Sequence, residues 1–63
     1  MYTIERTTSS GKVTVIKTVN TRRKANNVMD WTQENSSKSS TIALIHEKDV
    51  GVWVVLETRN GLN

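Results

Sequence analysis

The pattern of hydrophobic and polar residues along the chain predicts two strand pairs separated by one helix. Residues 2–8, YTIERTT, alternate between apolar and polar positions, and residues 13–19, VTVIKTV, are mostly β-branched. Both patterns are typical of strands. The loop between them contains Gly11, which can adopt positive φ, so we expect a hairpin. Residues 41–47, TIALIHE, and residues 52–58, VWVVLET, predict a second hairpin around residues 48–51.

The segment between the two hairpins predicts a helix that ends near Asn35. Asn20 or Thr21 can act as the N-cap, because either side chain can accept a hydrogen bond from an early helical N–H group. Residues 36–40, SSKSS, then form a polar connector. One face of the helix is marked by a stripe at helical spacing, formed by Ala25, Val28, Met29 and Thr32.

The element order β-β-α-β-β predicts a small two-layer α+β domain. We expect a four-stranded, mainly antiparallel sheet with one helix packed on one face, and a single domain over residues 1–63. Residues 59–63, RNGLN, precede no further strand and are expected to form a frayed C-terminal tail. Residues 52–58 are the most apolar, so we place them centrally, in the spatial strand order 1-2-4-3. Val55→Asp is therefore expected to unfold the protein.

The second predicted hairpin carries apolar residues on both faces. Ile42 and Leu44 alternate with Ala43 and Ile45. One helix covers only one face of such a sheet, so the other face needs a partner or exposes an apolar patch. We therefore expect an interface formed by Ile16, Ala43, Ile45 and Val55.

Composition narrows the chemistry that the chain can perform. It has no cysteine and one histidine, so we expect no disulfide, metal site or cofactor, and the cysteine count is compatible with a cytoplasmic setting. The longest apolar run, VWVVL, is far shorter than the roughly 20 residues of a membrane span. The strongest candidate for a catalytic cluster of titratable residues is HEKD, residues 46–49. Adjacent residues of a strand point to opposite faces, so His46 and Glu47 would not face each other. We expect no catalytic residues, no small-molecule substrate and no enzyme activity.

The sharpest feature is a basic cluster in the first turn of the predicted helix, where acidic residues would be stabilising. One interpretation is that the three residues, Arg22, Arg23 and Lys24, are solvated charges. The other is that their side chains and the free N–H groups of the turn together bind an anion such as a phosphate. Lys12 and Lys17 extend this patch if they project to the same side. The net charge of +3 favours anionic partners.

The two tryptophans receive different predictions. Trp53 alternates into a strand and is expected in the core. Trp31 lies at the flank of the helical stripe, where a half-exposed indole can anchor an interface. The sequence does not interleave aromatic and basic residues as single-strand nucleic-acid binders do, which lowers the ranking of nucleic acid as a partner.

Two functional hypotheses follow. The first is a non-enzymatic protein-interaction module, an inhibitor, adaptor or regulator, which forms a homodimer or docks on a larger protein. It would use the apolar sheet face and the basic helix N-terminus, and its size resembles that of accessory proteins of phages and mobile elements. The alternative is a small nucleic-acid-binding protein that contacts phosphates through Arg22, Arg23 and Lys24. We rank the first higher because strands that are apolar on both faces require a covering surface.

Overall fold

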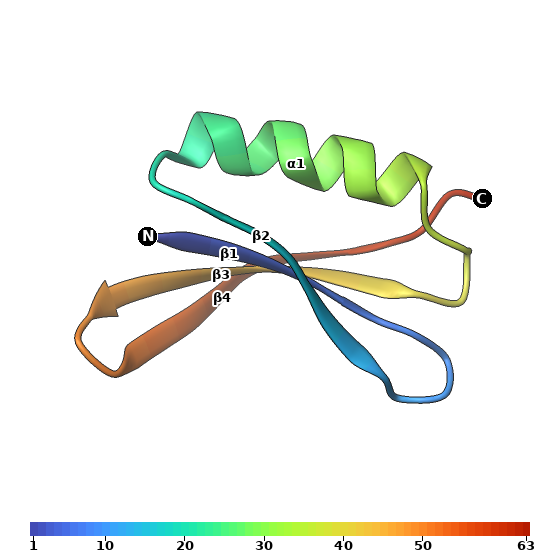
Figure 1. Ribbon diagram of the computed structural model, residues 1–63, viewed down its shortest axis with the longest axis horizontal. Helices are drawn as coiled ribbons and strands as arrows, with labels where there is room; N and C mark the ends of the chain where they lie inside the picture. Colours follow the sequence, from blue (N-terminus) through green and yellow to red (C-terminus); the bar gives the residue numbers. More distant parts are fainter.

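The computed structural model describes residues 1–63 and has the expected element order. The four strands form one open antiparallel sheet, and the helix lies across one of its faces (Figure 1), so the predicted small α+β fold is confirmed. The helix is neither long nor apolar enough to cross a membrane. The elements are β1 (Tyr2–Thr7), β2 (Val13–Val19), α1 (Arg22–Glu34), β3 (Thr41–Asp49) and β4 (Val52–Asn60).

The strand order is β2-β1-β3-β4, so the expected order 1-2-4-3, with β4 in the centre, is wrong. β1 pairs with both β2 and β3, whereas β4 pairs with β3 alone. The apolar composition of β4 was misleading, because Val55 lies on this edge strand with 57% of its surface exposed. An aspartate at position 55 is therefore no longer expected to unfold the protein.

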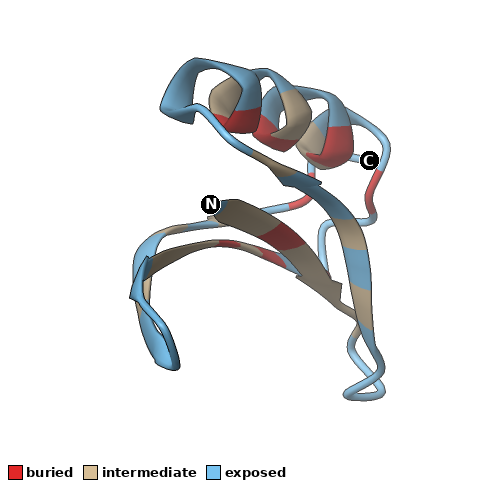
Figure 2. Ribbon diagram, turned by 60° about the vertical axis from the view of Figure 1, so that its left-hand side comes forward, coloured by how far each residue is buried: buried red, intermediate tan, exposed pale blue.

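The helix begins and packs as its sequence predicts. Thr21 is the N-cap, and its Oγ1 accepts a hydrogen bond of 3.2 Å from the backbone N–H of Lys24. Figure 2 shows the buried positions of α1 turned toward the sheet. Of the predicted stripe, Ala25, Met29 and Thr32 are buried. Val28 is half-buried and packs against the core.

The hydrophobic core is small and lies between α1 and the two central strands. Ile4 of β1 pairs directly with Leu44 of β3, and both are fully buried. A domain of this size buries only about 60% of the surface of its unfolded chain, so each core side chain carries a large share of the stability. The fully buried apolar residues are Ile4, Ala25, Met29, Ile42 and Leu44.

One polar group in this layer has no partner. The hydroxyl oxygen of Thr32 is buried and makes no hydrogen bond. An unpaired buried hydroxyl is costly, and valine has the same shape without it, so Thr32→Val should raise the free energy of unfolding by about 1 kcal/mol in urea titration. Thr21→Val is the matched control: it removes the N-cap and should lower stability by about 1 kcal/mol. A Thr32→Val variant that is no more stable than wild type would contradict this assignment.

A bulge interrupts the pairing of each edge strand. Between Ile4 and Glu5 of β1 the register skips Ile16 of β2, and between Leu44 and Ile45 of β3 it skips Leu56 of β4. A bulge re-aims the side chains beside it and discourages pairing of an edge with another chain. Both edges are therefore poorly suited to accepting a further strand.

The C-terminal tail, which was expected to be frayed from residue 59, is held in place. Residues 59 and 60 belong to β4. Beyond them, Gly61 N–H donates to the Ser40 carbonyl, Leu62 N–H to Gln33 and Asn63 N–H to Ser36, at 2.9–3.1 Å. The end of the chain thus closes over the C-terminus of α1. Gly61 is buried at this crossing.

Gly61→Ala should destabilise the protein because no space exists for a methyl group. A Cβ at this position would overlap the backbone carbonyl oxygens of Ser36 and Ser37. We expect a loss of about 1–3 kcal/mol in the free energy of unfolding, the range for overpacked sites. Asn63→Ala keeps the backbone hydrogen bonds of the tail and should change stability by less than roughly 0.5 kcal/mol. Wild-type stability of Gly61→Ala would show that the tail does not pack there.

Candidate docking surfaces

The face of the sheet that α1 leaves uncovered, here called the open face, presents an apolar patch. The ladder pairs place Val55 beside Ile45, and Ala43 lies on the same face because it alternates with the buried Ile42 and Leu44. A shallow hollow on this face is lined by Thr3, Glu5, Val15, Ile45 and Trp53. Three of the predicted interface residues, Ala43, Ile45 and Val55, are therefore brought together.

The large side chains of the open face are exposed. Val15 is 57% exposed, Trp53 53% and Val55 57%. The prediction that Trp53 belongs to the core is wrong, because Trp53 pairs with Glu47 on the face that no helix covers. Apolar residues that gather in one exposed patch mark interaction surfaces more often than scattered ones do.

A carboxylate stands at the centre of this apolar surface. Glu5 lies on the central strand β1 between Val15 of β2 and Ala43 of β3, and it makes no side-chain hydrogen bond or ion pair. Glu47 lies on the same face beside Trp53. None of the ladder positions that share the open face carries lysine, arginine or histidine. The alternation of residues 2–8 already placed Glu5 opposite Ile4, but its position in the middle of the patch depended on the strand order.

Ile16 is the predicted interface residue that does not reach the open face. It is the extra residue of the β2 bulge and packs against the core from the helix side. The bulge also re-aims Lys17, which pairs with Ile4 on the helix side. Strict alternation would have put Lys17 with Val13 and Val15 on the open face.

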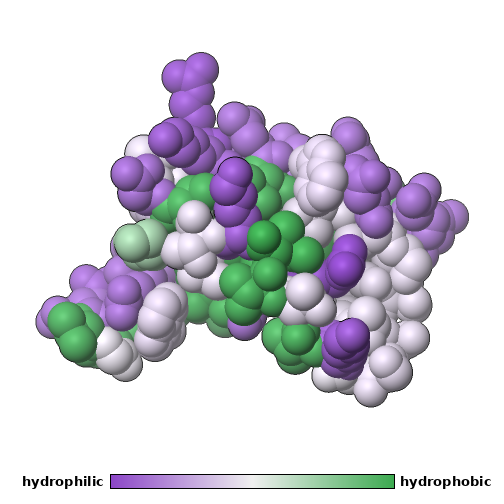
Figure 3. All heavy atoms as spheres, in the orientation of Figure 1, coloured by the Kyte–Doolittle hydropathy of each residue, from purple (hydrophilic) through white to green (hydrophobic).

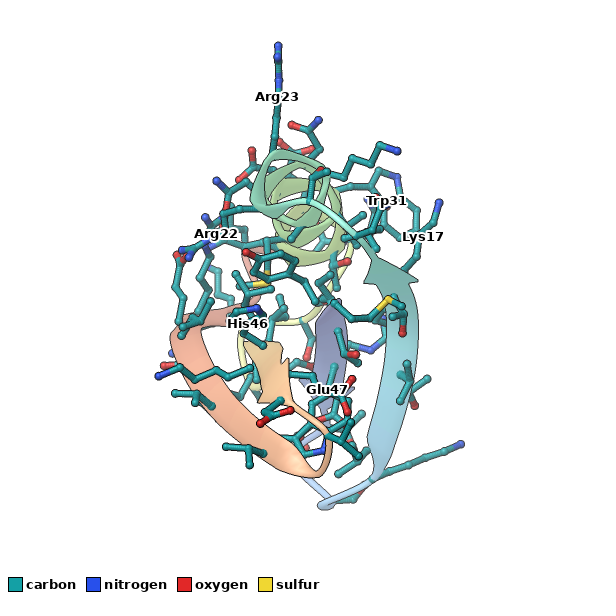
Figure 4. All side chains as sticks on the ribbon, turned by 90° about the vertical axis from the view of Figure 1, so that its left-hand side faces the viewer. Lys17, Arg22, Arg23, Trp31, His46 and Glu47 are labelled. Carbon is teal, nitrogen blue, oxygen red and sulfur yellow. The ribbon has the colours of Figure 1, made fainter.

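The basic cluster at the start of α1 does not converge on one point. Successive helical residues are about 100° apart, so adjacent side chains leave in different directions. Arg22 turns toward β4, where it lies 3.7 Å from Glu57 and bonds Asn26 at 3.3 Å. Figure 4 shows Arg23 extending into solvent and Arg22 on the opposite side from Lys17. Lys24 lines a groove with Lys17 instead.

This groove runs between α1 and β2, and we call it the helix–β2 groove. It consists of two hollows that share Lys17, Asn27 and Val28, with Lys24 at one end and Trp31 at the other. Figure 3 looks onto this side and shows a hydrophobic band below the helix with hydrophilic groups along it. Of the predicted binding residues, Lys17, Lys24 and Trp31 therefore meet, whereas Lys12 lies in the β1–β2 turn, away from them.

A charged network ties the edge strand β4 to the helix. The guanidinium of Arg59 lies 2.6 Å from both Glu57 and Asp30. Hydrogen bonds to Glu57 and Asp30 raise the pKa of Arg59 above its ordinary value. Arg22 is also directed at Glu57, so the positive and negative charges on this side of α1 offset one another. These contacts link α1 to β4.

His46 and Glu47 point to opposite faces, as their adjacent positions on a strand require (Figure 4). The imidazole of His46 stacks on the ring of Tyr2, with a centroid separation of 4.5 Å, beside the core. No group of three or more histidine, cysteine, aspartate or glutamate residues could hold a metal ion. The histidine is thus placed for packing against Tyr2.

Arg23→Glu should stabilise the protein. Arg23 is exposed and unpaired in the first turn, and an acidic side chain there interacts favourably with the helix dipole. We expect the free energy of unfolding to rise by about 0.3–1 kcal/mol at low salt, and the gain to shrink in high salt. Arg22→Glu is the matched comparison and should gain less, because it loses the contacts with Asn26 and Glu57. A drop in stability for Arg23→Glu would assign that residue a structural role.

Comparison of the chain with protein-family models, with curated proteins and with solved structures found no match. The two surfaces themselves therefore indicate what the protein can bind. The open face is apolar with a central acid, and the helix–β2 groove combines apolar side chains with lysines and neutral polar residues.

Proposed function

We propose that this protein is a non-enzymatic interaction module that docks through its open face onto another protein. The observation that carries the proposal is the exposure of Val15, Trp53 and Val55 on one side of a sheet whose other side holds the whole core. Covering such a patch removes apolar surface from water, worth about 25 cal/mol per Å² before the costs of association. A role as inhibitor, adaptor or regulator fits a domain that acts through an exposed binding surface.

Charge decides which kind of partner fits the open face best. Docking of a second copy would bury the Glu5 and Glu47 carboxylates of both chains, and none of the paired ladder positions of either open face supplies a cation to pair them, which is costly. A partner that presents lysine or arginine among apolar side chains would pair these acids instead. We therefore favour docking on a larger protein over homodimerisation, the other form of the interaction hypothesis.

Sedimentation equilibrium and binding of the neutral dye Nile red test this proposal together. The wild type should be monomeric at micromolar concentration and should bind the dye, and Val55→Asp should bind less dye while remaining folded. A monomer that binds no dye would contradict the docking role. A tight dimer would keep the open face as an interface but assign it to a second copy.

The nucleic-acid alternative ranks second on geometric grounds. Phosphate binding through the helix start needed Arg22, Arg23 and Lys24 to act together, and they point in three directions. Arg22 is also engaged with Glu57. The open face, which is acidic, would repel phosphates.

A further inference from the structure

We propose that the helix–β2 groove is a second binding site, which takes an extended acidic and apolar peptide segment of a protein partner. The groove is separate from the open face, since it lies on the helix side of β2 and shares none of the lining residues of the open-face hollow. The inference is therefore independent of the proposed function.

The apolar lining of the groove indicates what kind of group it covers. Ile16, Val28 and Trp31 line one hollow. The apolar residues of the other are Met1, Val19 and Val28, and its neutral polar residues are Thr18, Asn20 and Asn27. Trp31 is 60% exposed, so its indole is available as an anchor at the end of the groove. Three aliphatic side chains and one indole suit the apolar side chains of a peptide. A binder of single-stranded nucleic acid would show several stacking aromatics along its path.

The charges of the groove have one sign. Lys17 and Lys24 line it, neither forms an ion pair, and none of the six acidic residues of the chain is among its lining residues. The acids lie elsewhere, on the open face, in the network with Arg59 and at exposed positions of α1 and β3. Carboxylates of a bound segment would complement the two lysines.

Neither lysine is at a position where helix capping or strand alternation would favour it. Lys24 is the third residue after the N-cap Thr21, where glutamate would complete a capping box and favour the helix dipole. Lys17 reaches the groove only because the bulge at Ile16 re-aims it. Neither residue therefore owes its position to stability, and an anionic ligand accounts for both.

The test uses the two tryptophans, because each surface contains one of them. In a ¹⁵N-labelled protein the indole N–H signals of Trp31 and Trp53 report on the groove and on the open face, and Trp31→Phe assigns them. The probe is an acetylated, amidated octapeptide of alternating leucine and aspartate. It should shift the Trp31 signal in a saturable way and leave that of Trp53 in place. The comparison ligand is single-stranded octathymidylate.

Matched variants separate site binding from general electrostatics. Lys17→Glu with Lys24→Glu should weaken peptide binding by at least about tenfold, whereas Lys12→Glu with Lys38→Glu, the same charge change in exposed loops, should alter it by less than about twofold. Lys24→Glu completes the capping box, so the helix is expected to remain folded. Lys17→Gln with Lys24→Gln, which adds no repulsion, should give an intermediate loss.

Three outcomes would overturn the inference. Equal weakening by the groove and loop variants would show that only net charge matters. Tighter binding of octathymidylate than of the peptide would assign the groove to nucleic acid. A Trp31 signal that does not move at millimolar peptide would show that the groove is not a site, and none of these results would affect the role of the open face.

Discussion

Leu44→Ala is expected to lower the free energy of unfolding by about 2–5 kcal/mol. Leu44 is fully buried on the central strand β3, beside Ile4 and under α1, so its loss leaves a cavity in a core of five apolar residues. A domain of 63 residues has a total stability of roughly 3–9 kcal/mol, at 0.05–0.15 kcal/mol per residue. This single substitution therefore removes a large part of it.

Val55→Ala is the matched control, because it also shortens an aliphatic side chain in the second hairpin. Val55 lies on the edge strand with its side chain on the open face, and its loss should change stability by less than roughly 0.5 kcal/mol. Urea titrations followed by far-ultraviolet circular dichroism compare the two variants. Similar losses for both would mean that the assignment of covered and uncovered faces is incorrect.

Trp53→Ala is expected to weaken docking at the open face strongly while leaving the fold intact. The indole is 53% exposed and lines the same hollow as Glu5, so it combines a large apolar surface with access to a partner. Truncation of such an anchor typically costs about 2 kcal/mol or more in binding, which is roughly 30-fold in affinity. An octapeptide of alternating leucine and arginine, which matches the apolar and acidic character of the face, is the probe.

Trp31→Ala serves as the control for this variant, since it removes the other exposed indole of the protein. It should leave binding of the leucine–arginine peptide unchanged within about twofold, because Trp31 lies in the helix–β2 groove, on the opposite face of the sheet from the open face. Equal weakening by both variants would show that the peptide adheres to any exposed indole. Unchanged binding of Trp53→Ala would remove the open face from consideration as the docking surface.

The periodicity of the sequence predicted the helix and the strands, and it predicted which face of most of them is buried. The alternation of Ala43 and Ile45 with Ile42 and Leu44 was sufficient to indicate that one apolar set lies beneath the helix and the other does not. The helical spacing of Ala25 and its stripe likewise identified the buried side of α1. These inferences depend on local geometry alone, which is why they held.

The strand order, and the direction of the side chains on the edge strands, depend on long-range pairing. They could not be predicted from local periodicity. The apolar content of β4 suggested a central strand, although Glu57 and Arg59, two residues apart on one face, could have indicated an edge. The bulges at Ile16 and Leu56 turn Lys17 and Glu57 to the helix side. The basic cluster was expected to converge on one anion. It does not, because the side chains of adjacent helical residues leave the helix in different directions.

An NMR titration of the wild-type protein with the leucine–arginine peptide tests the docking role of the open face most directly. We predict that the Trp53 indole signal and the amide signals of Val15, Ile45 and Val55 shift together and saturate, and that Glu5→Gln weakens binding at least severalfold. The Trp31 signal should stay in place throughout. Shifts confined to other parts of the protein, or the same affinity for a leucine–aspartate peptide at these residues, would contradict the account.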